Sequence, residues 1–165
     1  MIEQKENPIG IDYEIQKFQN YLNKKLVEWN LQGFGRAELI DNKLLLYHKK
    51  NDYKNAFTLN PKFNGRFFFL DSNQSVFNNR ELKTFVELIF ILNIGKIKPN
   101  FSSRADEEVR IELLKFINNK VKREVSILKG QEVVKDYKND LVNMQPYHFL
   151  KFSFELKYNN NVNTF

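Results

Sequence analysis

The stretch YHFLKFSFELKY, Tyr147 to Tyr158, alternates large apolar side chains with polar ones. Apolar side chains occupy every second position, namely Leu150, Phe152, Phe154, Leu156 and Tyr158. Successive side chains of a β-strand point to opposite faces of a sheet, so this period of two predicts a long strand with one buried face. The polar set, Lys151, Ser153, Glu155 and Lys157, is expected to face water or another molecule. The fold is therefore expected to be a sheet that this strand completes.

Other parts of the chain also have the composition of strands. They are Ala37 to Tyr47, Asn55 to Leu70 and Val121 to Leu128, with turn residues such as Asp41-Asn42, Pro61 and Asn64-Gly65 between or within them. Thr84 to Ile94 fits a buried helix or a central strand, and its β-branched and aromatic residues favour the strand. The run Phe67 to Phe69 is expected to be buried in a strand, and a platform for stacking nucleic-acid bases is the alternative.

Two main helices are expected to pack on this sheet. An amphipathic helix is predicted from Ile11 to near Asn30 by the apolar stripe Ile11, Ile15, Phe18, Leu22, Leu26 and Trp29. Asp12 is well placed to cap it. The second helix is expected to start at the capping-box pattern Ser103 to Asp106 and to end near Asn118-Asn119. A short irregular helix is predicted over Val133 to Val142.

Together these elements predict a single α+β domain over residues 1–165. Its sheet is expected to be mixed or antiparallel, with an amphipathic helix at the N-terminus and a second helix after the central strand. Residues 1–10 and 159–165 are expected to be flexible tails. Residues 1–10 also lack the apolar core of a secretory signal, so the chain is expected to be made in, and stay in, the cytoplasm of its host. No apolar run approaches the roughly 18 to 20 residues that span a bilayer, so no membrane partner is expected.

The formal net charge is +6, from 26 basic and 20 acidic residues, which suits an anionic partner such as DNA. The basic residues occur as short, dispersed doublets, which is typical of solvated surfaces. The alternative is a small basic nucleic-acid-binding accessory protein. That alternative predicts one surface that gathers the side chains of Lys24, Lys25, Lys120, Lys122 and Arg123, and binding that weakens steeply as salt rises.

No reactive constellation stands out in the sequence. There is no cysteine, and His48 and His148 lie outside any metal-ligand spacing. Asp106 to Glu108 point in different directions on a helix, so we assign them to its first turn and not to a metal. A carboxylate pair from distant segments, for example Asp41 and Asp71, remains open. We therefore predict that the protein is not an enzyme, with no catalytic, cofactor-binding or metal-binding residues and no cofactor.

Several stretches of the chain resemble small virion proteins of tailed phages. The main ones are Leu88 to Pro99 (LIFILNIGKIKP), Ser103 to Val109 (SRADEEV), and Met144 to Phe149 (MQPYHF) with the alternating strand that follows. Asp12 to Leu22, the Gly35-Arg36 turn and Phe67 to Phe69 fit the same layout. The chain is similar to neck or tail-completion proteins of phages that infect Bacteroidetes-type bacteria, a group that includes the crAss-like phages. The resemblance covers most of residues 10–158 and leaves Asn42 to Asn64 without a counterpart.

This resemblance implies a tail-terminator-like fold and a structural, non-enzymatic role in the virion. Copies of such a protein pack side by side in a ring at the head–tail junction, around the DNA channel, and contact portal or tail ring proteins. Any contact with DNA is expected to be non-specific. The expected contact elements are the loop from Asn42 to Asn64, the segment from Gly130 to Pro146, and long strands with free edges such as Tyr147 to Tyr158.

Overall fold

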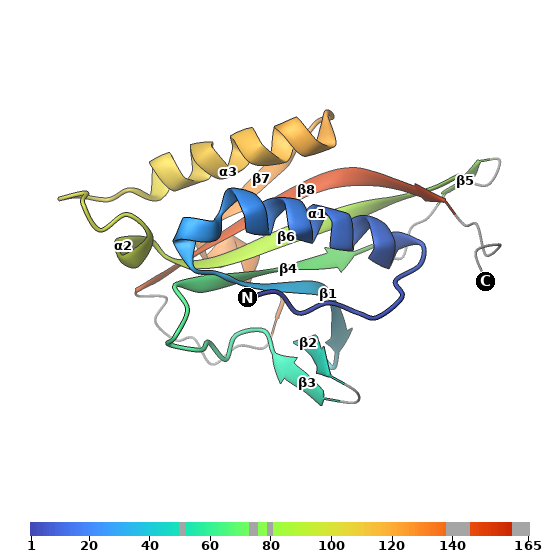
Figure 1. Ribbon diagram of the computed structural model, residues 1–165, viewed down its shortest axis with the longest axis horizontal. Helices are drawn as coiled ribbons and strands as arrows, with labels where there is room; N and C mark the ends of the chain where they lie inside the picture. The colour runs from blue at the N-terminus through green and yellow to red at the C-terminus, as the bar shows by residue number, and fades with distance from the viewer. Residues whose placement is uncertain (50–51, 73–75, 79–80, 138–145, 160–165) are drawn as a thin grey trace.

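A computed structural model of the chain describes residues 1–49, 52–72, 76–78, 81–137 and 146–159. The strands form one sheet in the order β3-β2-β1-β4-β6-β8-β7, and β5 pairs with β6 outside this order (Figure 1). They are β1 (Gln32–Ile40), β2 (Lys43–Lys49), β3 (Asp52–Asn55), β4 (Gly65–Asp71), β5 (Val76–Asn78), β6 (Glu81–Asn93), β7 (Ser126–Lys129) and β8 (Tyr147–Asn159). The helices are α1 (Ile11–Lys25), α2 (Ile94–Ile97) and α3 (Asp106–Val121), with 3-10 turns at Val27–Trp29 and Gly130–Val133. β1 pairs with β4 in parallel and with β2 antiparallel, which confirms the predicted α+β class with a mixed sheet.

β6 and β8 are the two longest strands described, and they lie side by side. They pair antiparallel over 13 residues, from Glu81 opposite Asn159 to Asn93 opposite Tyr147. The strand predicted from the alternating pattern is confirmed, because Phe152 and Phe154 are at most 1% exposed beneath the helices. The expectation that this strand has a free edge is wrong over part of its length, because β7 pairs with residues 150–153. Within the described ranges, no strand lies on the outer side of residues 154–159.

α1 and α3 cover one face of the sheet (Figure 1), and the apolar cluster that they form with β4, β6 and β8 is the helix-side core. The predicted stripe of α1 is buried against the strands, but the helix ends at Lys25, and the 3-10 turn after it carries Trp29 into the same core. Asn30 then adopts a left-handed backbone with φ of 52°, which ends the helical stretch. The prediction that Asp12 caps α1 is wrong. Gly10 is the N-cap, and the Asp12 carboxylate instead accepts hydrogen bonds from Lys5 and Arg36.

The boundaries of α3 and β7 also differ from the sequence prediction. Ala105 is the N-cap of α3, and no side chain caps the helix, so the capping box at Ser103 does not form. The acidic first turn does form as predicted. α3 continues to Val121, which packs against the helix-side core, and the left-handed Lys122 ends it. The strand predicted over Val121 to Leu128 is therefore confined to Ser126–Lys129.

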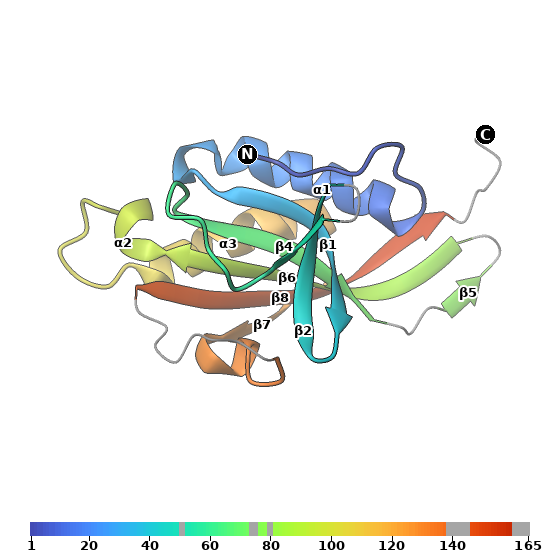
Figure 2. The same ribbon diagram turned by 90° about the horizontal axis from the view of Figure 1, so that it is seen from below.

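The opposite face of the sheet carries a second apolar cluster. β1 is irregular between Gly33 and Arg36, and beyond this point the β1–β2–β3 segment projects from the rest of the sheet (Figure 2). Asp41 and Asn42 have φ values of 51° and 63°, as a tight two-residue hairpin turn requires. The cluster joins residues of this segment to β4, β6 and β8; its members include Ala37, Leu44, Leu46, Phe68, Ile89, Ile91 and Phe149.

The phenylalanine run of β4 is divided between the two clusters. Phe67 and Phe69 lie in the helix-side core, and Phe68 lies in the cluster on the opposite face. Each of the three side chains is at most 1% exposed, so the predicted burial is confirmed. The base-stacking alternative is wrong, because stacking needs aromatic faces open to solvent.

The start of the expected N-terminal tail is held against β1. Ile2 forms a parallel bridge with Gly33, and the amide of Glu3 donates to the Gly33 carbonyl at 2.8 Å. The buried Gln19 side chain donates to the carbonyls of Glu3 and Gly33. These bonds show that this part of residues 1–10 is not a free tail. Residues 160–165 of the expected C-terminal tail, and 138–142 of the helix expected over Val133 to Val142, lie outside the described residues.

Gly65 gives a direct test of the packing between β4 and β6. A Cβ added there would lie 2.2 Å from the carbonyl oxygen of Ile91, and the φ of Gly65 is +150°. We expect Gly65→Ala to lower the free energy of unfolding by about 2 kcal/mol or more, measured by urea denaturation. Gly35→Ala is the matched control, because a Cβ at Gly35 meets nothing within 4 Å. Equal effects of the two substitutions would contradict the strand register.

Candidate functional site

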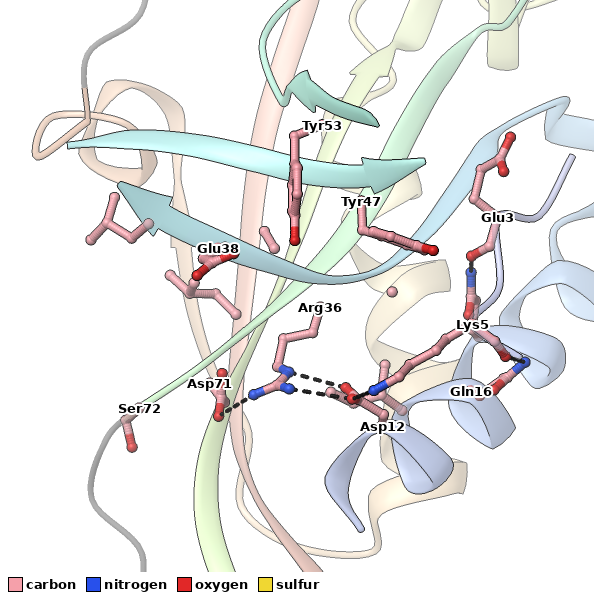
Figure 3. A pocket seen from close by; sticks show the side chains of 16 residues that line it. Glu3, Lys5, Asp12, Gln16, Arg36, Glu38, Tyr47, Tyr53, Asp71 and Ser72 are labelled. Atoms are coloured by element: carbon pink, nitrogen blue, oxygen red, sulfur yellow. Dashed lines mark hydrogen bonds and ion pairs between the residues drawn. The ribbon is translucent and has the colours of Figure 1, made fainter. Parts of the chain in front are cut away.

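A cleft of about 820 Å³ lies between the N-terminal segment, α1 and the β1–β2–β3 segment (Figure 3). It forms because α1 and α3 pack over β4, β6 and β8, while residues Arg36 and Glu38 of β1 remain exposed on the same side. Its polar lining residues are Glu3, Lys5, Asp12, Gln16, Gln19, Arg36, Glu38, Asp71 and Ser72. Its apolar and aromatic lining comes from Ile15, Ala37, Leu39, Leu70, Tyr47 and Tyr53.

Arg36 is the centre of an ion-pair cluster in this cleft (Figure 3). Its Nε and Nη2 atoms donate to the two oxygens of Asp12 at 3.0 and 3.2 Å, and its Nη1 donates to Asp71 at 3.4 Å. Lys5 Nζ donates to Asp12 at 2.9 Å. Partial burial lowers the pKa of the Arg36 guanidinium, but the charges of Asp12 and Asp71 outweigh it and raise the pKa above its ordinary value. The cluster therefore ties together α1, β1, β4 and the N-terminal segment.

This cluster has the character of a structural ion-pair network. Each carboxylate accepts hydrogen bonds from a cation, and every member comes from a different part of the chain. Such networks fix the relative positions of the elements that carry them. Of the carboxylate pair left open by the sequence, Asp71 lies in this cluster, whereas Asp41 lies in the β1–β2 turn and does not line the cleft.

The aromatic wall of the cleft is exposed to solvent. The rings of Tyr47 and Tyr53 meet edge to face, with centroids 5.9 Å apart, and the residues are 39% and 46% exposed. They are direct partners across β2 and β3, and they share a face with Arg36 because Ala37 pairs with Leu46. Ile40, on that same face, is 43% exposed. A group of exposed apolar side chains on a projecting segment is typical of a protein-interaction surface.

Arg66 holds the connection from β3 to β4 in place. It is 2% exposed, its Nη1 donates to the carbonyls of Asn55 and Ala56, and its Nη2 donates to Gln32. The guanidinium carbon lies 5.2 Å from the centre of the Phe34 ring. Burial lowers the pKa of Arg66 to about 10, so the group still carries its charge at neutral pH. This buried side chain anchors the end of β3 and thereby the aromatic wall.

The five basic residues of the nucleic-acid alternative are partly gathered. Lys25 and Lys120 lie over the Tyr21 ring, with Nζ 5.9 and 5.6 Å from its centroid, where α1 and α3 face each other. Arg123 forms an ion pair with Glu155, which offsets its charge. Lys24 and Lys122 lie at the C-terminal ends of the same two helices. The structure thus brings together two of the five residues around one ring.

The other sequence candidates have structural neighbours or lie at separate positions. Asp106 is paired with Arg104 and Glu107 with Arg110, and each of these hydrogen bonds lowers the pKa of its carboxyl. His48 lies on β2, and His148 lies opposite Leu92 on β8. In the described parts of the chain, no three potential metal-ligating side chains come together. No helix among the described residues is both long enough and apolar enough to cross a bilayer.

The cleft residues were not identified from the sequence. Asp12 and Arg36 are 24 residues apart, and Asp71 is 35 residues from Arg36, so no short motif joins them. Tyr47 and Tyr53 do carry a weak signal, because each stands three residues from Lys50 in the sequence. They belong to the Asn42 to Asn64 stretch predicted as a contact element, which folds into β2, β3 and the connection to β4.

No protein-family model, curated protein or solved structure matches this chain. The tail-terminator-like fold, the virion role and the partners implied by the resemblance therefore stay predictions.

The ion-pair cluster predicts a salt-dependent contribution to stability. We expect Asp12→Asn to lower the free energy of unfolding by about 1–2 kcal/mol, because it removes the carboxylate shared by Arg36 and Lys5. The loss should shrink in high salt, which screens the attraction. Glu14→Gln is the control, because its ion pair with Lys17 within α1 is worth about 0.5 kcal/mol or less. Urea denaturation at low and high salt measures both, and a loss that is the same at both salt levels would contradict the electrostatic account.

Proposed function

We propose that this protein is a non-enzymatic structural component of a tailed-phage virion, a ring subunit at the head–tail junction that assembles around the DNA channel. The observation that carries the proposal is the projecting β1–β2–β3 segment with its exposed Tyr47, Tyr53 and Ile40. The resemblance of the Leu88 to Pro99 and Met144 to Phe149 stretches to neck and tail-completion proteins supports it.

The exposed aromatic wall favours a role in assembly. The side chains of Tyr47 and Tyr53 leave large apolar areas in water that a partner surface would bury, and tyrosine is among the residues enriched in protein interfaces. Arg66 and the Arg36 cluster fix the segment that carries them. A contact surface held rigid in this way loses little conformational freedom when it binds.

The shape of the subunit suits a ring that joins two different neighbours. β6 and β8 run along the long axis of the molecule, so one end presents β5 and the other end presents α2 (Figures 1 and 2). A ring of such subunits, all in the same orientation, has two unlike rims. One rim would meet the portal side and the other the tail side of the junction.

The positive charge supports contact with the DNA that passes through the ring. Lys25 and Lys120 converge on Tyr21, while Lys24 and Lys122 lie at the C-terminal ends of α1 and α3. Phosphate attraction of this kind is independent of sequence and falls with salt. A stand-alone nucleic-acid-binding protein, favoured by the same convergence, is the second candidate function. It predicts tight DNA binding by the isolated protein, with an affinity that falls steeply as salt rises.

Peptide mass spectrometry of purified phage particles tests the proposal. We expect this chain in the particles at a fixed ratio to the portal protein, as a ring subunit requires. The control is a host cytoplasmic protein of similar abundance, which purification should remove. Absence from particles, with the protein abundant in cells, would contradict the virion role and favour the nucleic-acid-binding alternative.

A further inference from the structure

The sheet ends in short or partly open strands on both sides. β3 is the last strand at one end and has only four residues, Asp52–Asn55. At the other end β7 covers residues 150–153 of β8, and no described strand pairs with residues 154–159 on that side. Unpaired strand edges present backbone donors and acceptors that another strand can bind.

A second cleft, of about 230 Å³, lies beside the open part of β8. It is bounded by Phe18 of α1, Val121 at the end of α3, and Leu156 of β8. Lys120, Arg123 and Lys157 supply positive charge at its rim, and Glu14 and Glu155 supply negative charge. Leu156 and Val121 are only partly buried at the border of the helix-side core. Arg123 is paired with Glu155, so the free positive charge at the rim comes from Lys120 and Lys157. The cleft therefore offers an apolar floor and a rim of mixed charge next to a strand edge that no described strand covers.

We infer that β3 of one copy pairs antiparallel with residues 154–157 of β8 in the next copy, and that this contact closes the ring; the inference rests on the proposed function above. Tyr53 then lies opposite Leu156. Lys54 lies opposite Glu155, and Asp52 lies opposite Lys157. Both charged pairs are of opposite sign. Lys54 would join the ion pair that Glu155 forms with Arg123 in its own copy, and Asp52 would join Glu81 beside Lys157.

In this register the paired side chains of Tyr53 and Leu156 also lie on the same face of the sheet. Leu156 packs at the helix-side core, so its side chain is on the helix side of β8. Tyr53 is on the same side as Arg36, which contacts α1 through Asp12 (Figure 3). Directly opposite residues on neighbouring strands share a face. Pairing Tyr53 with Leu156 therefore continues the sheet with the helices of both copies on one side.

The second cleft is suited to the Tyr53 side chain. A ring placed beside Leu156 on the helix side enters the space bounded by Phe18 and Val121. Lys120, which already lies over the Tyr21 ring, is at the rim of that space and can contact a second aromatic face. The phenol oxygen of tyrosine remains able to reach water or the charged side chains of the rim. This arrangement accounts for an exposed tyrosine at the tip of a rigid segment.

The contact joins two different surfaces, so it repeats from copy to copy. A contact of this kind produces a closed ring when the rotation between copies closes, and an open filament when it does not. Pairing of β3 with β3, in contrast, would be symmetric and would stop at a dimer. Pairing of β3 with β8 and pairing of β3 with β3 would therefore give different cross-linked products when cysteines are placed at the contact.

Disulfide trapping tests the inference, because the chain has no cysteine of its own. The variant carries Tyr53→Cys and Leu156→Cys. In the inferred contact, the Cβ atom of position 53 in one copy lies directly opposite that of position 156 in the next, close enough for a disulfide. Strands β2, β1, β4 and β6 separate the two positions within one copy, so the link forms between copies. We expect mild oxidation of the concentrated protein to give a ladder of trimers and larger products on a non-reducing gel.

Matched variants identify the contact. Tyr47→Cys with Leu156→Cys moves one cysteine a strand away from the edge and should give no ladder. Tyr53→Cys alone should give no dimer above background; a strong dimer would show that β3 pairs with β3 and would overturn the inference. A ladder no stronger than that of the Tyr47→Cys control would overturn it as well. Circular dichroism of each variant checks that the fold is kept.

Charge reversal gives a second readout. We expect Asp52→Lys or Lys157→Asp to weaken association by about tenfold, and the double variant to restore most of it, measured by analytical ultracentrifugation. No recovery in the double variant would contradict the register. Particles that contain the protein without the ladder would refute this contact and leave the virion role standing. A ladder without the protein in particles would support the contact and refute the role.

Discussion

The antiparallel pairing of β6 with β8 over 13 residues is the constraint on which the rest of the structure depends. Along both strands, alternate apolar side chains enter the helix-side core. Ile89, Ile91 and Phe149 point the other way and enter the cluster on the opposite face. β4 pairs with β6 on one side, and β7 pairs with β8 on the other. Because both apolar clusters rest on these two strands, a change in their register would move every apolar side chain to the wrong face.

The two ends of the sheet are the parts that we propose to bind partners. The sheet bends at β1, and buried Arg66 together with the Arg36 ion pairs fixes the position of the projecting β1–β2–β3 segment. The same fixation leaves Tyr47 and Tyr53 in solvent, where they do not contribute to the core of the single chain. At the other end, β7 covers only residues 150–153 of β8, and no other described strand pairs with the outer edge of that strand. In our proposal a neighbouring copy supplies what each end lacks, which is why we favour assembly over catalysis.

The sequence predicts most of the central fold and little of the site. The period of two in Tyr147 to Tyr158 and the helical stripe from Ile11 reflect local geometry, and both are found in the structure. The role of Asp12 was missed because its partner Arg36 lies 24 residues away, and this contact replaced the expected helix cap. The burial of Arg66 likewise depends on the carbonyls of Asn55 and Ala56, which only the folded chain brings near. Contacts of this kind leave no periodic pattern in a sequence.

Electron cryo-microscopy of the head–tail junction tests the central claim most directly. The account predicts a ring of copies of this chain around the DNA, with the sheet of each copy continuing into the next through β3 and the open edge of β8, and with all helices on one side of that sheet. A junction built without this chain would contradict the account. So would a ring in which the copies meet through α1 and α3 while β3 and the end of β8 face solvent.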